Sequence, residues 1–312
     1  DNITLQKMMA GKQASLSLSL GETAESISGS STPGDLETMM QLLWLRFAGP
    51  RFDSVAHSAI IGRYASLLIN MEKDPQKIMS DSLNLITTGH HPRTPVLTSK
   101  SVSSITLDEV RDIYTGRFRD AADFTFIIVG NIEKELLQPL VEKYIGSLPT
   151  GNTRELWIDR KIRQPRGKLN REIDIPLTVP KASVYLVFSE EMKYKPANYL
   201  GVDIIGAILD IVLTEKVREE QGGTYGVGVS LSASKRPSPT AGGVISFDCD
   251  PERATELKGI IYSEINNLIK DGPSEENLSK AVKNMIKTRE ENRLHNSYWL
   301  STLSRYYNYG ID

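Results

Sequence analysis

Two side chains that could stabilise a developing negative charge lie seven residues apart in the stretch REEQGGTY, residues 218–225. Arg218 carries a planar guanidinium that stays charged, and Tyr225 carries a phenol that can donate a hydrogen bond. Two such donors facing one site suit a peptide carbonyl oxygen, which gains negative charge in a tetrahedral intermediate. The alternative is a purely structural corner, in which Arg218 is solvated and Tyr225 packs in a core. The pattern predicts an oxyanion-binding pair and leaves this alternative open.

The surrounding residues predict a corner between a helix and a strand. Gly222 and Gly223 follow an apolar-periodic segment, and a glycine pair there ends a helix because glycine accepts the left-handed conformation. Beyond them, apolar and small residues alternate through residue 232, as in a strand. Gly226 and Gly228 leave one strand face without side chains. We therefore expect these two glycines to bind substrate, since an extended peptide backbone can approach closely there.

This corner resembles a motif of a known enzyme family. Arg-x-x-x-x-Gly-x-Tyr at a helix-to-strand corner is similar to the Arg/Tyr motif in the C-terminal half of pitrilysin/insulinase-type zinc peptidases, the inverzincins. Their metal site, His-x-x-Glu-His, lies in the N-terminal half. The resemblance implies that Arg218 and Tyr225 are catalytic residues. They would reach across a closed chamber to the substrate carbonyl, while the other half supplies zinc, its water and the Glu base.

The chain itself offers no zinc-binding motif. Its histidines are His57, His90, His91 and His295, and none occurs in His-x-x-Glu-His or His-Glu-x-x-His. His90 and His91 are adjacent in a Pro-flanked loop, and chain neighbours seldom reach one metal together. We therefore expect no metal ligand or cofactor in this chain and no peptidase activity of the chain alone. The resemblance implies that zinc is bound in a missing N-terminal half.

Other chemistries find less support. The sequence has no Gly-x-Ser-x-Gly nucleophile elbow. The glycines of residues 222–228 could imitate a phosphate-binding loop, but such a loop runs from strand to helix and this corner runs from helix to strand. A net charge of −2 predicts no nucleic-acid partner, and no apolar run approaches the roughly 18 residues needed to span a bilayer. Cys249 is the one cysteine, which excludes an internal disulfide, and we expect it to be buried in a strand.

Periodicity and capping signals predict mixed α and β structure. Strands are expected at residues 14–20, within 21–31, and at 124–129, 183–188, 224–232 and 243–249. Helices are expected at 33–48, 55–71, from 75, from the capping box at 106–109, at 136–145, at 196–220, at 250–268 and from 274 towards 299. Between them, 149–176 reads as a linker with at most one short strand. Its cations, Arg160, Lys161, Arg163, Arg166 and Lys168, are interpreted as solvated.

An internal comparison indicates two related domains. The strand Phe124–Val129, the turn Gly130-Asn131 and a helix match the strand Val244–Cys249, the turn Asp250-Pro251 and a helix. We therefore predict an α+β protein of two related domains, each with a mostly antiparallel sheet covered by helices. The resemblance implies the LuxS/MPP-like metallohydrolase fold. Residues 1–150 would be a third repeat domain, truncated at its N-terminus, 151–176 a linker, and 177–312 the fourth repeat domain.

The chain begins at Asp1 without an initiator Met, so we expect a fragment of a longer protein. The resemblance implies the non-zinc C-terminal half of a zinc metalloendopeptidase that degrades peptides in a closed chamber. Its partners would be its own N-terminal half and peptide substrates, and bacterial relatives imply a periplasmic or cell-envelope location.

Two alternatives stay open. One is an inactive peptide-binding or scaffold subunit, like the partners of mitochondrial processing peptidase or the respiratory-complex core proteins. The other is a metal-free module that binds extended peptides. The Arg218/Tyr225 pair favours the enzyme, because a scaffold does not need it.

Overall fold

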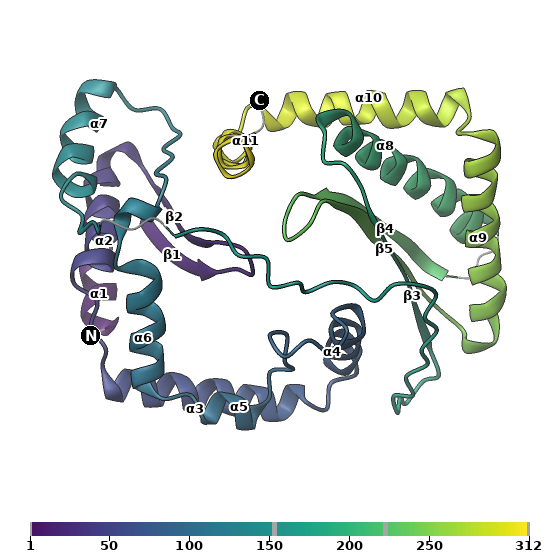
Figure 1. The fold of residues 1–312 in the computed structure, drawn as a ribbon, viewed down its shortest axis with the longest axis horizontal. Coiled ribbons are helices and arrows are strands. Elements are labelled where there is room, and N and C mark those ends of the chain that lie inside the picture. The colour runs from purple at the N-terminus through teal and green to yellow at the C-terminus, as the bar shows by residue number, and fades with distance from the viewer. Residues whose placement is uncertain (1, 152–154, 221–223, 311–312) are drawn as a thin grey trace. The chain divides into compact units, whose positions relative to one another are not determined.

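The computed structural model describes residues 2–151, 155–220 and 224–310, and the chain divides into two compact units (Figure 1). Each unit is built from separate stretches of the chain. Unit 1 consists of Asp1–Lys73, Val96–Ile158 and Trp299–Asp312, and unit 2 consists of Asp74–Pro95 and Asp159–Tyr298. The division of the chain into two repeat domains, with boundaries at 150 and 177, stays a prediction.

Unit 1 is mainly helical around one hairpin. Its elements are α1 (Asn2–Met8), β1 (Ala14–Leu20), β2 (Glu25–Ser31), η1 (Pro33–Asp35), α2 (Leu36–Ala48), α3 (Ser54–Met71), α5 (Ser99–Ser103), α6 (Leu107–Phe118), η2 (Ala121–Asp123), α7 (Lys134–Leu140), the π-helical η3 (Val141–Ile145) and most of α11 (Asn296–Tyr309). The strand predicted from the serine–leucine alternation at 14–20 is confirmed as β1, and it pairs antiparallel with β2. The capping box at Thr106 and Glu109 is confirmed at the start of α6.

An aromatic core holds unit 1 together. Phe47 of α2 is buried with Ala121 and Leu148, and Phe124 and Phe126 pack against this cluster. The rings of Phe47 and Phe124 meet edge to face at 5.1 Å. The segment after η2 therefore joins the core through its side chains.

The prediction of a strand at Phe124–Val129 is wrong. These residues belong to no strand of the structure, and β1 and β2 form a two-stranded sheet among the described residues. The sequence shows which side chains are apolar, but a strand also needs a partner with which to hydrogen-bond. The apolar residues of this segment are instead explained by packing on the aromatic core.

Unit 2 holds a three-stranded antiparallel sheet in the order β3-β5-β4. Its elements are α4 (Pro75–Thr87), β3 (Ala182–Glu191), α8 (Pro196–Leu213), the π-helical η4 (Thr214–Glu220), β4 (Thr224–Ser234), β5 (Thr240–Cys249), η5 (Pro251–Arg253), α9 (Ala254–Asp271) and α10 (Glu275–Asn292). The helix starts predicted near residues 75, 250 and 274 are confirmed, and Asp74, Asp250 and Ser274 each accept a backbone N–H hydrogen bond there. The predicted long helix 196–220 changes to a π-helix at Thr214.

One face of this sheet is buried under helices. Ile245, Phe247 and Cys249 of β5 alternate with less buried residues and join the buried Leu257 and Ile261 of α9. Helix α8 packs on β4 and against α9 and α10 (Figure 1). Cys249 is 6% exposed, which confirms that it is a buried cysteine. The fold is thus the predicted α+β type, with antiparallel strands and helices on one side of the unit 2 sheet.

Helix α8 and the start of η4, Pro196–Val217, are long and apolar enough to cross a membrane by length and composition, which the sequence analysis did not expect. The packing gives this apolar character another explanation. Ile208, Leu209 and Leu213 are buried in unit 2, while Leu200 on another side of the helix is 51% exposed. The core-facing stripe is that of a helix that covers a sheet.

The described residues 149–151 and 155–181 contain neither helix nor strand. The possible short strand in the predicted linker, 149–176, is therefore absent from its described residues, 149–151 and 155–176. The helix expected to run from residue 274 towards 299 ends at Asn292, and α11 begins at Asn296. Neither difference touches the predicted corner of α8, η4 and β4.

Candidate functional site

The predicted catalytic pair lies at the corner between η4 and β4. Arg218 belongs to η4 and Tyr225 to β4, but the side chains of both residues, and residues 221–223, lie outside the described part of the chain. Gly226 and Gly228, the predicted substrate-binding residues, are described. That Arg218 and Tyr225 face one site therefore stays a prediction. The residues before and after them in η4 and β4 are described.

The corner is anchored to the core on both sides. Leu213 and Val217 precede Arg218 and are fully buried, and Val227 follows Tyr225 with 9% exposure. All three belong to the same buried cluster as Ile245. Residues held by packing in this way keep a fixed backbone position. The backbone on each side of the predicted pair is thus part of the unit 2 core.

A β-bulge lies directly at the corner. Thr224 pairs with Cys249 and Val227 with Phe247, so Tyr225 and Gly226 together stand opposite the single residue Asp248. A bulge of this kind bends the strand and redirects side chains, and bulges are common beside active sites. The register therefore places Asp248 next to the predicted catalytic tyrosine on the neighbouring strand.

Asp248 faces away from the helices and is held by two neighbours. Ser183 Oγ donates a hydrogen bond of 2.6 Å to Asp248 Oδ1, and Lys181 Nζ lies 2.9 Å from Oδ2. Partial burial of the carboxyl opposes ionisation, but the hydrogen bond from Ser183 and the contact with Lys181 outweigh it and lower the pKa of Asp248. A negative charge is therefore fixed at the bulge.

The sheet face opposite the helices, here called the open face, carries small residues of β4 and β5 next to this charge. Gly228 of β4 is in register with Ser246 of β5, and the larger Tyr185 of β3 lies on the other side of Ser246. A Cβ added to Gly228 would meet Ser246 Oγ at 3.5 Å, an ordinary contact, and one added to Gly226 would meet no described atom within 4 Å. Both predicted substrate-binding glycines therefore leave room on the strand, as the sequence analysis expected.

Sequence reasoning missed Asp248, Ser183 and Lys181. In their strands, Asp248 and Ser183 alternate with apolar residues, and this pattern could have placed both side chains on the less buried face. The register that brings them together with the bulge could not be deduced, because a shift of one residue would exchange the two faces.

The described residues offer no metal site. No group of three or more His, Cys, Asp or Glu side chains lies close enough to hold an ion among them. His57 Nε2 is buried and has no hydrogen-bond partner within the described part of the chain, and His91 Nδ1 accepts a hydrogen bond of 3.1 Å from the backbone N–H of Arg93. The described part of the chain therefore offers no ligand set that fits zinc.

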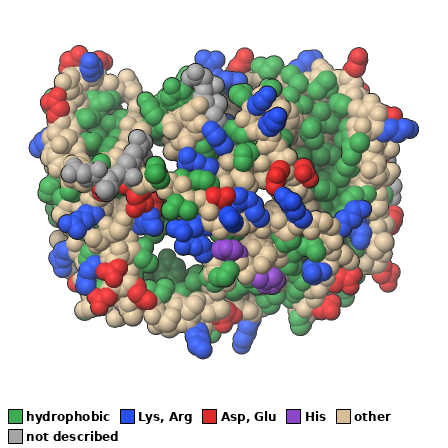
Figure 2. Space-filling model, in the orientation of Figure 1, with side chains coloured by type: hydrophobic (Ala, Val, Ile, Leu, Met, Phe, Trp, Pro, Cys, Tyr) green, Lys and Arg blue, Asp and Glu red, His purple; other side chains and the backbone are tan. Residues whose placement is uncertain are grey.

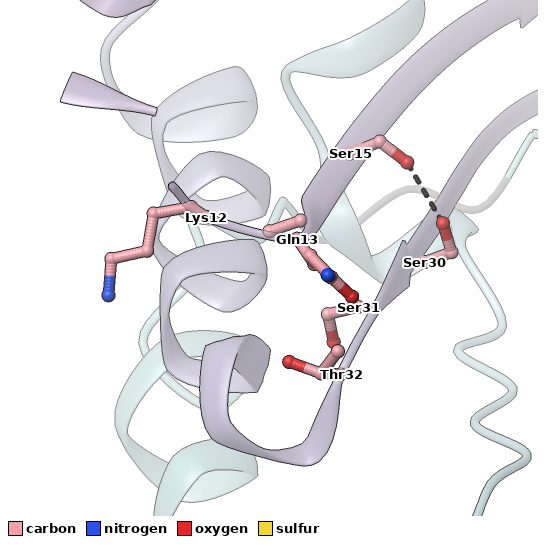
Figure 3. Close-up of a pocket in the computed structure, with 7 residues that line it drawn as sticks. Lys12, Gln13, Ser15, Ser30, Ser31 and Thr32 are labelled. Atoms are coloured by element: carbon pink, nitrogen blue, oxygen red, sulfur yellow. Dashed lines mark hydrogen bonds between the residues drawn. The ribbon is translucent and has the colours of Figure 1, made fainter. Parts of the chain in front are cut away.

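A shallow hollow in unit 1 is not a catalytic site. It measures about 420 Å³ and lies between the start of β1 and the end of β2 (Figure 3). Ser15 Oγ and Ser30 Oγ lie 2.9 Å apart, and the one charged lining residue, Lys12, pairs with Asp35 at 3.3 Å. The lining side chains provide neither a general base nor an activated nucleophile.

Comparison with known families supports the resemblance. A family model described as the peptidase M16 inactive domain matches residues 104–285, more than half of the chain. The zinc protease PQQL-like of Arabidopsis thaliana is 25% identical over 289 residues, which cover 88% of this chain and 30% of that protein.

Solved structures share the fold. The periplasmic protease PqqL from Escherichia coli has a TM-score of 0.83 at 18% identity and matches 99% of this chain and 34% of its own. The peptidase M16 inactive domain from Pseudomonas fluorescens has a TM-score of 0.76 at 17% identity, with 100% of this chain and 75% of that chain covered. The chain thus spans about a third of the length of the PqqL-type proteins. It belongs to the peptidase M16 family, the pitrilysin/insulinase-type peptidases, as an inactive domain of that family.

Proposed function

We propose that this chain is the non-zinc C-terminal half of a zinc metalloendopeptidase and that it forms one wall of the chamber in which peptides are cut. The observation that carries the proposal is the bulged corner of β4, anchored by Val217 and Val227 beside the positions of Arg218 and Tyr225. The similarity to PqqL-type zinc proteases supports the reaction class. The zinc would be held by the N-terminal half, where it would activate water for attack on the peptide carbonyl.

In this proposal the chain binds the substrate and stabilises charge. An extended peptide would lie along β4, where Gly226 and Gly228 leave space for its backbone. Arg218 and Tyr225 would donate hydrogen bonds to the carbonyl oxygen as it becomes negative. The core-anchored backbone on each side would hold the two donors in place before the reaction, so that little reorganisation is needed.

The test is substitution of the tyrosine in the complete protein that contains this chain. Tyr225→Phe should lower kcat by ~10–1000-fold, the scale of losing one oxyanion donor, while the bound zinc stays unchanged. Tyr262→Phe on α9, a half-exposed tyrosine distant in sequence, is the matched control and should leave kcat unchanged. An unchanged kcat in both Tyr225→Phe and Arg218→Ala would exclude the proposed role.

A second candidate is a subunit that binds peptides or partners without cutting them. The family description as an inactive domain and the absence of a metal cluster among the described residues both agree with it. The two candidates differ in the residues that precede Asp1 in the full gene. A His-x-x-Glu-His motif there would support the peptidase. A full gene and partner genes without that motif would support the binding subunit.

We further propose a periplasmic or cell-envelope location if the source is a bacterium. The similar Escherichia coli PqqL is described as a periplasmic protease. Subcellular fractionation with an antibody to this chain tests the location, and recovery in the cytosolic fraction would exclude it.

A further inference from the structure

The structure brings scattered cations of unit 2 onto one surface. Residues 159–171 contain six Lys and Arg residues and one acid, Asp159, in a chain whose net charge is −2. A Cβ added to Gly89 would lie 3.8 Å from Pro165, so the loop that contains Arg93 packs against the middle of this segment. Blue side chains accordingly gather beside purple ones on the face seen in Figure 2.

Two acids near these cations, Asp159 and Glu191, are already paired. Asp159 accepts hydrogen bonds from the backbone N–H of Lys161, at 2.8 Å, and from Arg163 Nη1, at 3.0 Å. The hydrogen bond and charge of Arg163 hold the pKa of Asp159 below its ordinary value. Arg166 Nη2 pairs with Glu191 Oε1 at 2.7 Å. Two cations are therefore neutralised locally.

The remaining cations are exposed and have no ion-pair partner among the described residues. They are Arg93, Arg160, Lys161, Lys168 and Arg171, named here the basic surface. Uncompensated charges of one sign raise the local concentration of an oppositely charged ligand and speed its association. Within 149–176 the excess of positive charge is confined to residues 159–171, which are followed by Glu172 and Asp174. The interpretation of the whole stretch as a solvated linker does not account for this excess.

We propose that the basic surface binds acidic, unfolded peptide segments and so selects substrates rich in Asp and Glu. The role of the bound peptide as a substrate rests on the proposed function, whereas binding itself does not. Exposed Arg and Lys side chains along an irregular segment match carboxylates spread along a flexible chain. Single-stranded nucleic acid is disfavoured because residues 159–181 contain no aromatic side chain on which a base could stack.

Binding is tested with a labelled peptide as long as residues 159–171 in which every second residue is Glu, and with the same peptide carrying Gln at those positions. Fluorescence anisotropy with the 312-residue chain should show about tenfold tighter binding of the Glu peptide. The difference should disappear when salt rises from about 0.1 M to about 1 M, since the Debye length falls from about 10 Å to about 3 Å. Equal affinity for the two peptides at low salt would overturn the proposal.

A charge-reversal variant and a matched control locate the site. Arg160→Glu, Lys161→Glu and Arg171→Glu together should abolish the preference for the Glu peptide. Lys270→Glu, Lys283→Glu and Lys287→Glu on α9 and α10 change the net charge equally and should retain it. Equal effects of the two triple variants would contradict the proposed location.

Further binding measurements control for misfolded variants and for binding of other classes of ligand. The neutralising variant Arg93→Gln with Lys168→Gln should weaken Glu-peptide binding about threefold at an unchanged melting temperature. Tighter binding of an oligothymidine or of vesicles with anionic lipid than of the Glu peptide would overturn the assignment to acidic peptides. Tyr225→Phe should leave the preference for the Glu peptide over the Gln peptide unchanged. This binding measurement therefore separates a failure of the basic-surface proposal from a failure of the catalytic proposal.

Discussion

Ser183 on β3 and Asp248 on β5 face each other on the open face of the unit 2 sheet, joined by a hydrogen bond of 2.6 Å. The register sets Asp248 opposite the bulge that contains Tyr225 and Gly226. A carboxylate is therefore fixed beside the predicted catalytic tyrosine. This relationship yields a prediction about stability that does not depend on the proposed reaction.

Asp248→Asn should destabilise the chain in a pH-dependent way. The pKa of Asp248 is lowered in the folded state, so its contribution is fully present above the unfolded-state pKa of about 3.9 and is lost as the pH falls through the lower folded-state value. The side chain is 46% exposed, so solvent screening keeps the loss of unfolding free energy at pH 7 below about 1 kcal/mol. Urea unfolding at several pH values measures it. A difference between the two proteins that grows below pH ~3.9 would contradict this sign.

Gly226→Val and Gly228→Val should lower peptide affinity by about tenfold or more without unfolding the chain. An added Cβ would meet no described atom within 4 Å at Gly226 and would make an ordinary contact at Gly228, and valine suits a strand. Gly243→Ala is the contrasting variant, because its Cβ would lie 1.8 Å from the backbone oxygen of Ser230. Thermal unfolding should therefore be nearly unchanged in the first two variants and strongly impaired in the third. Unchanged peptide affinity in both valine variants would argue against binding at β4.

Val217→Ala should destabilise unit 2 by roughly 1–3 kcal/mol, because it removes buried methyl groups and leaves a cavity. Val217 is 0% exposed and immediately precedes Arg218, so the variant should also lower turnover of the complete peptidase. Val55→Ala on α3, where the side chain is 78% exposed, should change stability by less than about 0.5 kcal/mol. Denaturant titration of both variants makes the comparison, and equal losses would show that Val217 is not a core residue.

Cys249 should be unreactive until the chain unfolds. Burial, followed by the charges of Asp250 and Asp248, raises the pKa of its thiol, so little of the reactive thiolate forms at neutral pH. Alkylation with iodoacetamide should be slow in buffer and should accelerate along the urea unfolding transition. Rapid labelling at a urea concentration far below that transition would show that the end of β5 opens locally.

Prediction from the sequence succeeded where one segment determines the outcome. The alternation in β1, the capping box at Thr106 and the helix start at residue 274 depend on neighbours within a few residues, and all are found. The prediction of a strand at Phe124–Val129 failed because a mostly apolar run does not reveal whether a partner strand is present. The residues around the predicted site divide in the same way. The space at Gly226 and Gly228 follows from their residue type, and their binding of substrate stays a prediction, whereas the position of Asp248 depends on strand register.

The interleaving of the two units has a consequence for limited proteolysis. The chain passes between units at residues 73/74, 95/96, 158/159 and 298/299. A single nick in the exposed segment 159–171 would therefore produce two fragments that each contain parts of both units. We expect the two fragments of such a nicked protein to elute together from a sizing column and to separate only in denaturant. A native gel should therefore show one band, and a gel with SDS should show two.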